Sequence, residues 1–127
     1  MFISNPSLKA IPLLLLVLLP PLAADEAPMS VFFEEAVAAA IQHPSPEYNS
    51  VATQLKLSGL VEVAAFVDTE GNVYDTIIIT GNPVLTHLAV DAVRHWKFRP
   101  FHDEHGKIVK AMAYLKFVME PPKKQLK

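Results

Sequence analysis

The spacing of apolar residues changes several times along the chain and predicts the order of its elements. Apolar residues recur at helical spacing from Val31 to Gln42 and again from Tyr48 to Leu57, with two prolines between these stretches. From Leu60 to Val67 the period falls to two, which is typical of a strand with one buried face. A helical stripe follows from Val84 to Trp96, and alternation returns from Ile108 to Met119. We therefore expect two helices, a pair of strands, a third helix and a final strand.

The pair of strands has the pattern of a hairpin. Asp68-Thr69-Glu70-Gly71 is a turn sequence, and the return strand runs from Asn72 to Thr80. Val73 and Ile78 are an odd number of residues apart, so both reach the core only if a bulge lies near Asp75-Thr76. The consecutive residues Ile77-Ile78-Ile79 make both faces of this strand apolar. We expect one face to pack on the core and the other to be covered by the N-terminal helix or by a partner chain.

The helical stripes also predict which residues face the core. In the first helix, with Ser30 as its N-cap, they are Phe33, Val37, Ala40 and Ile41, and in the second they are Val51 and Leu55, with Ala52 as a further candidate. In the third they are Leu85, Leu88, Ala89, Ala92, Val93 and Trp96. The predicted fold class is α+β. It is a two-layer sandwich in which a helix crosses over a three-stranded antiparallel sheet, preceded by a short N-terminal helix.

The first 24 residues have the order of a secretory signal peptide. An apolar run of ten residues, Ala10 to Leu19, precedes two prolines and the small residues before Asp25. The run is shorter than the roughly 20 residues that cross a membrane, so we expect cleavage after Ala24, with a retained anchor as the alternative. The expected organisation is a signal at 1–24, a leader and short helix at 25–47, a domain at 48–119 and a basic tail at 120–127.

Composition and candidate chemistry narrow the function classes. The formal net charge is −2 without a basic cluster in the domain, which argues against nucleic-acid binding, and the absence of cysteine excludes disulfides after export. No nucleophile–base pair is recognisable, so we expect no enzyme, no small-molecule substrate and no cofactor. His102 and His105, with Asp103 and Glu104, form the densest polar cluster, but they lack a fixed third ligand. We interpret this segment as a solvated loop rather than a metal site.

The end of the third helix carries the most specific motif, Ala92-Val93-Arg94-His95-Trp96-Lys97-Phe98-Arg99-Pro100. Pro100 cannot continue a helix and favours extended geometry at Arg99, so two large aromatics stand where a helix becomes an extended segment. Trp96 and Phe98 complete an apolar stripe, and we interpret them as core residues rather than as a binding platform.

With this motif the stretch from Tyr48 to Met119 resembles the C-terminal domain of the TonB family of energy transducers. The resemblance also includes the strand Val61-x-Val63-x-x-x-Val67, the hairpin turn and the pair Gly106-Lys107. Its signature positions in this chain are Tyr48, Gly59, Gly71, Trp96, Phe98 and Pro100. The chain departs from the family pattern at Asn49, where a proline is usual, and at Ala65, where an aromatic is usual. Only residues 25–47 stand in place of a long proline-rich spacer.

The resemblance implies a periplasmic, non-catalytic module. It would capture a short peptide near the N-terminus of an outer-membrane transporter, or of another envelope protein, by adding it beside the last strand. Carried over, that edge strand comprises Ile108, Val109, Lys110, Ala111, Met112, Ala113, Tyr114, Leu115, Lys116 and Phe117. The lysines of this strand are also what a protein uses to protect an edge from aggregation. The alternative function is a self-associating accessory domain without transporter coupling, in which Ile77-Ile78-Ile79 and the edge strand form a homodimer surface.

Overall fold

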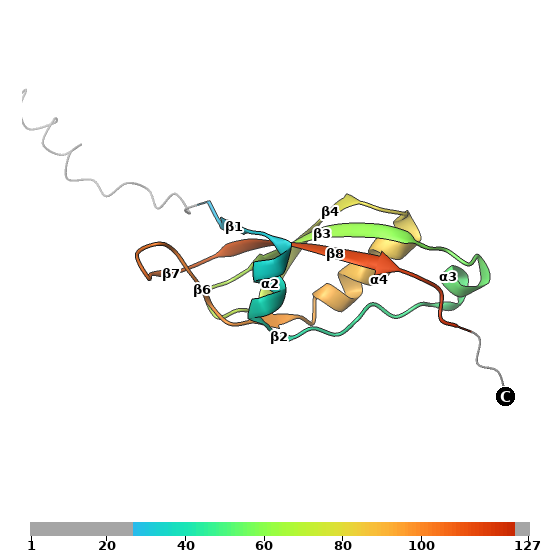
Figure 1. Cartoon of the computed structure of the whole chain (residues 1–127), viewed down its shortest axis with the longest axis horizontal. Coiled ribbons are helices and arrows are strands. Elements are labelled where there is room, and N and C mark those ends of the chain that lie inside the picture. Colours follow the sequence, from blue (N-terminus) through green and yellow to red (C-terminus); the bar gives the residue numbers. More distant parts are fainter. Residues whose placement is uncertain (1–26, 124–127) are drawn as a thin grey trace, which may run out of the picture.

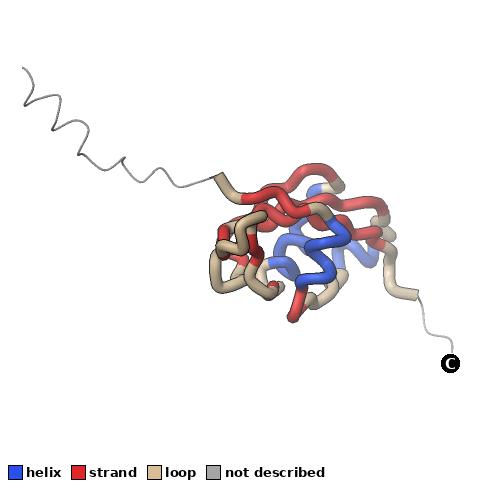
Figure 2. The backbone as a smooth tube through the Cα atoms, turned by 60° about the vertical axis from the view of Figure 1, so that its left-hand side comes forward, coloured by secondary structure: helices blue, strands red, loops and turns tan. Residues whose placement is uncertain are grey.

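The chain forms a four-stranded mixed sheet with helices packed on one of its faces (Figures 1 and 2). The computed structural model describes residues 27–123, so the predicted signal at 1–24 and the last part of the basic tail lie outside the described residues. In chain order the elements are β1 (Met29–Val31), α2 (Phe33–Ala39), β2 (Ala40–Gln42), α3 (Ser50–Gln54), β3 (Gly59–Val67), β4 (Val73–Thr80), α4 (Pro83–Val93), β5 (Lys97–Phe98), β6 (Phe101–His102), β7 (Ile108–Val109) and β8 (Ala111–Met119).

The predicted α+β class is confirmed, but the sheet has one strand more than expected. Its order is β1-β8-β3-β4, and the pairs β8–β3 and β3–β4 are antiparallel. The additional strand is β1, which runs parallel to β8 and pairs Met29, Ser30 and Val31 with Ala111, Met112 and Ala113. A strand of three residues is too short to show a period of its own in the sequence.

The N-terminal helix is shorter than the predicted stretch from Val31 to Gln42. The helix covers only Phe33–Ala39, and its N-cap is Phe32, without a side-chain cap, instead of Ser30. The residue that it buries is Ala36. Of the predicted inward residues, Phe33 and Ala40 are partly buried, whereas Val37 and Ile41 are 42% and 57% exposed, so the prediction is wrong at Val37 and Ile41. The cause is tertiary. The chain becomes extended at Ala40 so that β2 can pair with β5.

The hairpin from β3 to β4 forms as expected, with a bulge near the predicted position and a second, unpredicted one. The Asp68 carboxylate accepts hydrogen bonds from the backbone N–H groups of Glu70 and Asn72, both at 2.9 Å, and thereby fixes the turn. The register slips at Tyr74, next to the predicted Asp75-Thr76, and again at Ile79. The prediction that Ile78 belongs to the core is wrong, because β4 is an edge strand and the side chain is 52% exposed.

The helix α4 supplies the clearest agreement between pattern and structure. The Asn82 side chain caps it by accepting a hydrogen bond from the Val84 N–H at 2.8 Å, and Pro83 occupies its first turn. Most of the predicted stripe is buried, namely Leu85, Leu88, Ala89, Val93 and Trp96, with Ala92 partly exposed. In α3, by contrast, only the further candidate Ala52 is buried, and the predicted Val51 and Leu55 are 49% and 63% exposed. That helix has only five residues, too few for its stripe to identify a face.

Two clusters of buried residues fill the space between the sheet and the helices. The first is built around Trp96 and Phe98 and includes Val31 of β1 and Ala36 of α2. The second joins α4 to the far end of β3 through Leu85, Leu88 and their neighbours. Because α2 and α4 both pack against inward residues of β3 and β8, they lie on the same face of the sheet, as Figure 2 shows.

Candidate functional site

Trp96 lies at the junction of α4, the sheet and the N-terminal segment. It is 7% exposed, and its indole N–H donates a hydrogen bond to the Pro44 carbonyl at 2.9 Å. Its ring meets Phe117 edge-on, with 5.8 Å between the centroids, and Phe98 at the same distance in a tilted arrangement. Trp96 and Phe98 are therefore buried, as the stripe predicted, and they anchor the scaffold.

Of the other signature positions, Gly71 supports the same junction. Gly71 has φ +90°, and a Cβ there would lie 1.9 Å from the carbonyl oxygen of Phe98, so only glycine fits. The Phe98 N–H in turn donates a hydrogen bond to the Gly71 carbonyl at 2.9 Å. The hairpin turn thus docks on the extended segment after α4. Gly59 has open space around its Cα, and Pro100 is exposed.

Tyr48 holds the connection between α3 and β3. Its hydroxyl donates a hydrogen bond to the Leu57 carbonyl at 2.7 Å. Burial, and in addition the negative charge of Glu120, raise the pKa of the Tyr48 hydroxyl. The next residue, Asn49, is the N-cap of α3 and accepts a hydrogen bond from the Ala52 N–H at 2.8 Å. Asparagine in place of the family's proline therefore supplies a cap.

The stretch predicted as one edge strand, Ile108 to Phe117, divides into three parts. Ile108 and Val109 form β7 and pair with β6. The Lys110 carbonyl then accepts a hydrogen bond from the Met29 N–H at 2.9 Å, and Ala111–Ala113 pair with β1. On the side of β8 away from β3, no strand of the described residues pairs beyond Ala113. The open part of the edge therefore begins at Tyr114 and extends two residues past the predicted end, to Met119. We refer to residues 114–119 as the open edge.

A hollow of about 300 Å³ lies beside the open edge. One wall is the end of β8 with Glu120, and the other is the segment before α3. The lining residues are Ser45, Pro46, Tyr48, Lys116, Phe117, Val118, Met119 and Glu120. Val118 is 78% exposed and Phe117 is half-buried. The wall formed by Ser45 and Pro46 could not be predicted from the sequence, because in the hydrophobic pattern these residues only separate two helices.

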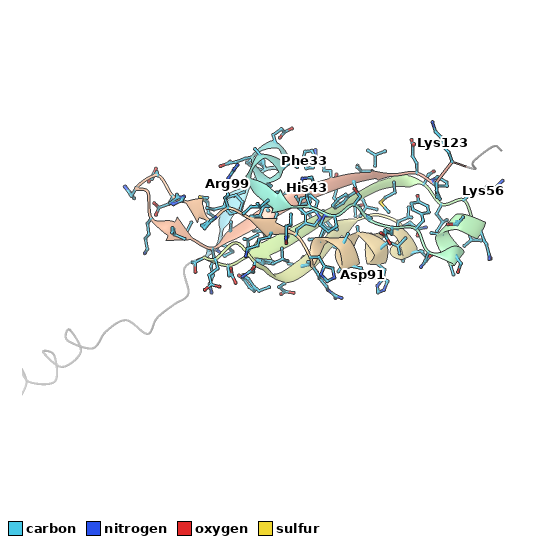
Figure 3. All side chains as sticks on the ribbon, turned by 90° about the horizontal axis from the view of Figure 1, so that it is seen from below. Phe33, His43, Lys56, Asp91, Arg99 and Lys123 are labelled. Atoms are coloured by element: carbon cyan, nitrogen blue, oxygen red, sulfur yellow. The ribbon has the colours of Figure 1, made fainter. Side chains whose placement is uncertain are left out.

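Hydrogen bonds from Arg99 hold the N-terminal segment against the extended segment that follows α4. The Arg99 N–H donates a hydrogen bond to the Ala39 carbonyl at 2.8 Å, and the Arg99 guanidinium donates one to the Ala38 carbonyl. Figure 3 shows Phe33 and His43 near the middle of the elongated domain, Arg99 to the left of them, and Lys56 and Lys123 towards the right-hand end. The segment before α3 is thus part of the folded domain.

The sheet face opposite the helices carries aromatic side chains. Phe32 and Tyr114 stack with 5.9 Å between their ring centroids, and Phe66 and Tyr74 lie 6.1 Å apart. The Lys110 ammonium lies 5.6 Å above the Tyr74 ring. These rings make the second face of the sheet apolar near both of its edges.

The other edge of the sheet is β4. Ile77, Ile78 and Ile79 are 50%, 52% and 46% exposed, and the N-terminal helix that was one expected cover instead packs on β8. Within the described residues this edge has no neighbouring strand.

The polar loop after β6 is organised as a turn. The Asp103 carboxylate accepts hydrogen bonds from the backbone N–H groups of His105 and Lys107 at 2.8 and 2.9 Å. His105 and Glu104 form an exposed pair at 3.5 Å. Among residues 27–123, no three His, Cys, Asp or Glu side chains are grouped as metal ligands would be. That part of the chain also has no helix with the length and hydropathy needed to span a membrane.

Comparison with known proteins places this geometry in a family. A search of curated proteins finds no match. Among solved structures, the chain is similar to the C-terminal domain of Pseudomonas aeruginosa TonB, with 23% identity, a TM-score of 0.54 and coverage of 68% of this chain and 88% of that one. It is also similar to the TonB2 protein of Vibrio anguillarum, with 18% identity, a TM-score of 0.50 and coverage of 97% and 98%. At these identities the two likenesses establish the fold.

The model of the Gram-negative bacterial TonB protein C-terminal family matches residues 44–119, more than half of the chain. Domains of this family are periplasmic, and they take part in energy transduction for outer-membrane transport through interaction rather than catalysis. The chain therefore belongs to the Gram-negative bacterial TonB protein C-terminal family.

Proposed function

We propose that this domain captures an extended segment of an outer-membrane transporter, or of another envelope protein, by adding it as a strand beside β8. The observation that carries this proposal is the open edge. There β8 has a partner on the β3 side, and the described residues supply none on the other side. Backbone N–H and C=O groups on such an edge are donors and acceptors that an incoming strand can satisfy.

The burial of β8 supports this use. Its inward side chains Ala111, Ala113 and Leu115 are fully or almost fully buried, so the strand is held firmly from one face. A rigid strand is a better template than a mobile one, because less conformational entropy is lost when the partner binds. Main-chain hydrogen bonds would supply the affinity, and the side chains around the edge would supply the selectivity.

The test is backbone chemical-shift mapping of the isotope-labelled domain with synthetic N-terminal peptides of candidate transporters. We expect the largest shifts at Tyr114 to Met119. A scrambled peptide of the same composition serves as the control. If no candidate peptide shifts the amides of β8, the proposed capture mode is wrong.

A second function, self-association, is favoured by the exposed isoleucines of β4. Three consecutive isoleucines, each about half exposed on an unpaired edge, form the kind of strand that pairs with a second chain. Pairing of β4 with its own copy about a two-fold axis would close into a dimer. Light scattering over a concentration series tests this function, with Ile78→Lys as the variant that should dissociate the dimer. A monomer at every concentration would exclude it.

We also infer that the domain reaches the periplasm through cleavage of the signal after Ala24. Support comes from the family's location and from the apolar run at Ala10 to Leu19. Mass spectrometry of the exported protein should show a chain that begins at Asp25. A chain that still contains Met1 would instead indicate a domain anchored in the inner membrane and facing the periplasm.

A further inference from the structure

We propose that β1 permanently closes the first part of the β8 edge, so that the partner segment binds only on the open edge and places an apolar side chain in the adjoining hollow. This inference rests on the proposed function and deepens it. It defines the ligand as a short extended segment of about five or six residues, to match the open edge, with apolar side chains at alternate positions.

The strand β1 is built into the core. Val31 is fully buried in the cluster around Trp96, and the helix that follows it buries Ala36 completely. Displacing β1 would take Val31 out of this cluster. Arg99 would hold the far end of the segment in place through the Ala38 and Ala39 carbonyls. The strand β1 therefore blocks the edge of β8 to any other strand as far as Ala113.

The direction of the backbone groups on the open edge follows from the hydrogen-bond pattern of β8 with β1 and β3. The Lys110 carbonyl points towards β1, because it accepts the hydrogen bond of Met29. From Ala111 to Met119 the pairing of β8 with β3 has no register shift, so every second residue presents its N–H and C=O to the same side. The parallel pairing of Val31 with Ala113 directs the Tyr114 N–H to the Val31 carbonyl. The outward groups that stay open are therefore the Tyr114 C=O and the N–H and C=O groups of Lys116 and Val118.

The position of the hollow determines what the partner's inward side chains meet. The half-buried Phe117 lies on the helix side of the sheet, and Pro46 and Tyr48 form the opposite wall. Trp96 holds this wall in place through its hydrogen bond to the Pro44 carbonyl. The hollow is thus bounded by two aromatic rings and a proline, with Ser45, Lys116 and Glu120 as its polar lining. It can receive an aliphatic side chain of the added strand that lies opposite Phe117 and faces the helix side of the sheet.

Two synthetic pentapeptides test this inference. The probe is acetyl-Thr-Val-Thr-Val-Thr-amide, whose symmetric sequence presents the same side chains in either strand direction. The control replaces both valines by aspartate. Titration of the isotope-labelled protein to millimolar peptide should shift the open edge with the first peptide only. Nuclear Overhauser contacts should join the valine methyls to the Tyr48 ring.

Matched variants test the backbone contribution. Lys116→Pro removes an outward N–H that the fold does not use, a position where an edge strand tolerates proline. Lys116→Ala removes the same side chain and keeps the N–H. Proline should weaken binding about 2- to 10-fold relative to alanine, which corresponds to the loss of one hydrogen bond. If Lys116→Pro unfolds, Val118→Pro against Val118→Ala provides the same comparison at the exposed end.

The outcomes separate the inference from the function on which it rests. Unchanged hydrogen-exchange protection of Met29 to Val31 in the bound state supports a fixed β1. Binding with loss of that protection, or with peptide contacts at Ala111 to Ala113, overturns the inference and leaves strand capture intact. Equal affinity of the proline and alanine variants also overturns it. If neither this probe nor any transporter peptide shifts β8, both the inference and the proposed function fail.

Discussion

Replacing Trp96 by alanine should strongly destabilise the domain. The indole is 7% exposed and contacts Phe98, Phe117 and His43 within 5.8 Å between ring centroids. Truncation of a buried tryptophan costs about 3–5 kcal/mol, out of a total of about 5–15 kcal/mol for a small domain. At about 4–8 °C per kcal/mol for a domain of this size, the melting temperature should fall by at least about 12 °C.

The variant Trp96→Phe separates ring packing from the hydrogen bond. It keeps an aromatic ring in the cluster and loses the N–H that Pro44 accepts. Pro44 is exposed, so its carbonyl can be hydrated in the variant, and we expect a cost of about 1–2 kcal/mol. Thermal and urea unfolding followed by far-ultraviolet circular dichroism measure both variants without a tryptophan signal. An unchanged melting temperature of Trp96→Ala would refute the reasoning, because it would mean that the indole is not part of the core.

The remaining predictions concern the turn, a helix cap and pH. Gly71→Ala should cost more than Gly106→Ala in urea unfolding. Both substitutions place an alanine in a left-handed backbone conformation, which costs about 1–2 kcal/mol. Only at Gly71 does the new Cβ also meet the Phe98 carbonyl, whereas Gly106 has open space. Asn82→Ala should cost about 0.5–2 kcal/mol, and an unchanged urea midpoint would show that the cap is not formed in solution. Because folding raises the pKa of Tyr48 above its free value of 10.0, its contribution to stability is complete below about pH 10 and is lost as pH rises through the folded pKa. Tyr48→Phe should remove this decline from a series of urea midpoints.

The part of the fold from β3 to β8 was predictable because its patterns are long and mutually consistent. The alternation of β3, the turn at Asp68 to Gly71 and the stripe of α4 each extend over enough residues to indicate both an element and its inward face. The burial of Trp96 followed from the same stripe, since the ring continues the line of Leu85 and Leu88.

The N-terminal part was predicted poorly because tertiary contacts decide its structure. Met29 to Val31 form a strand only because β8, about 80 residues later, offers them an edge. Similarly, Ala40 to Gln42 leave the helical pattern to pair with β5. A three-residue strand carries no periodic signal, and a helix of seven residues has too few turns to determine its own inward face.

The strand that carries the candidate site was predicted, but the extent of its open edge was not, for the same reason. The alternation of Ile108 to Phe117 shows that a strand is present, but a sequence does not show which neighbours a strand has. The hydrogen bond from Met29 to Lys110 and the pairing at Ala111 to Ala113 remove the first half of that stretch from the open edge. The hollow depends on Ser45 and Pro46, which are distant in sequence from β8 and carry no motif.

The structure also shortens the distance that residues 25–47 can span between the signal and the folded domain. As a free, fully extended leader these 23 residues would span about 80 Å. However, Met29 to Gln42 are built into the sheet and α2, and the segment up to Tyr48 lines the hollow. Only residues 25–28 then separate Ala24 from the folded domain, a distance of at most about 14 Å. A domain retained by its first 24 residues would therefore stay beside the inner membrane, where an outer-membrane transporter peptide would have to come to it. Cleavage after Ala24 would remove this restriction, so peptide capture at the outer membrane and release of the signal are linked expectations.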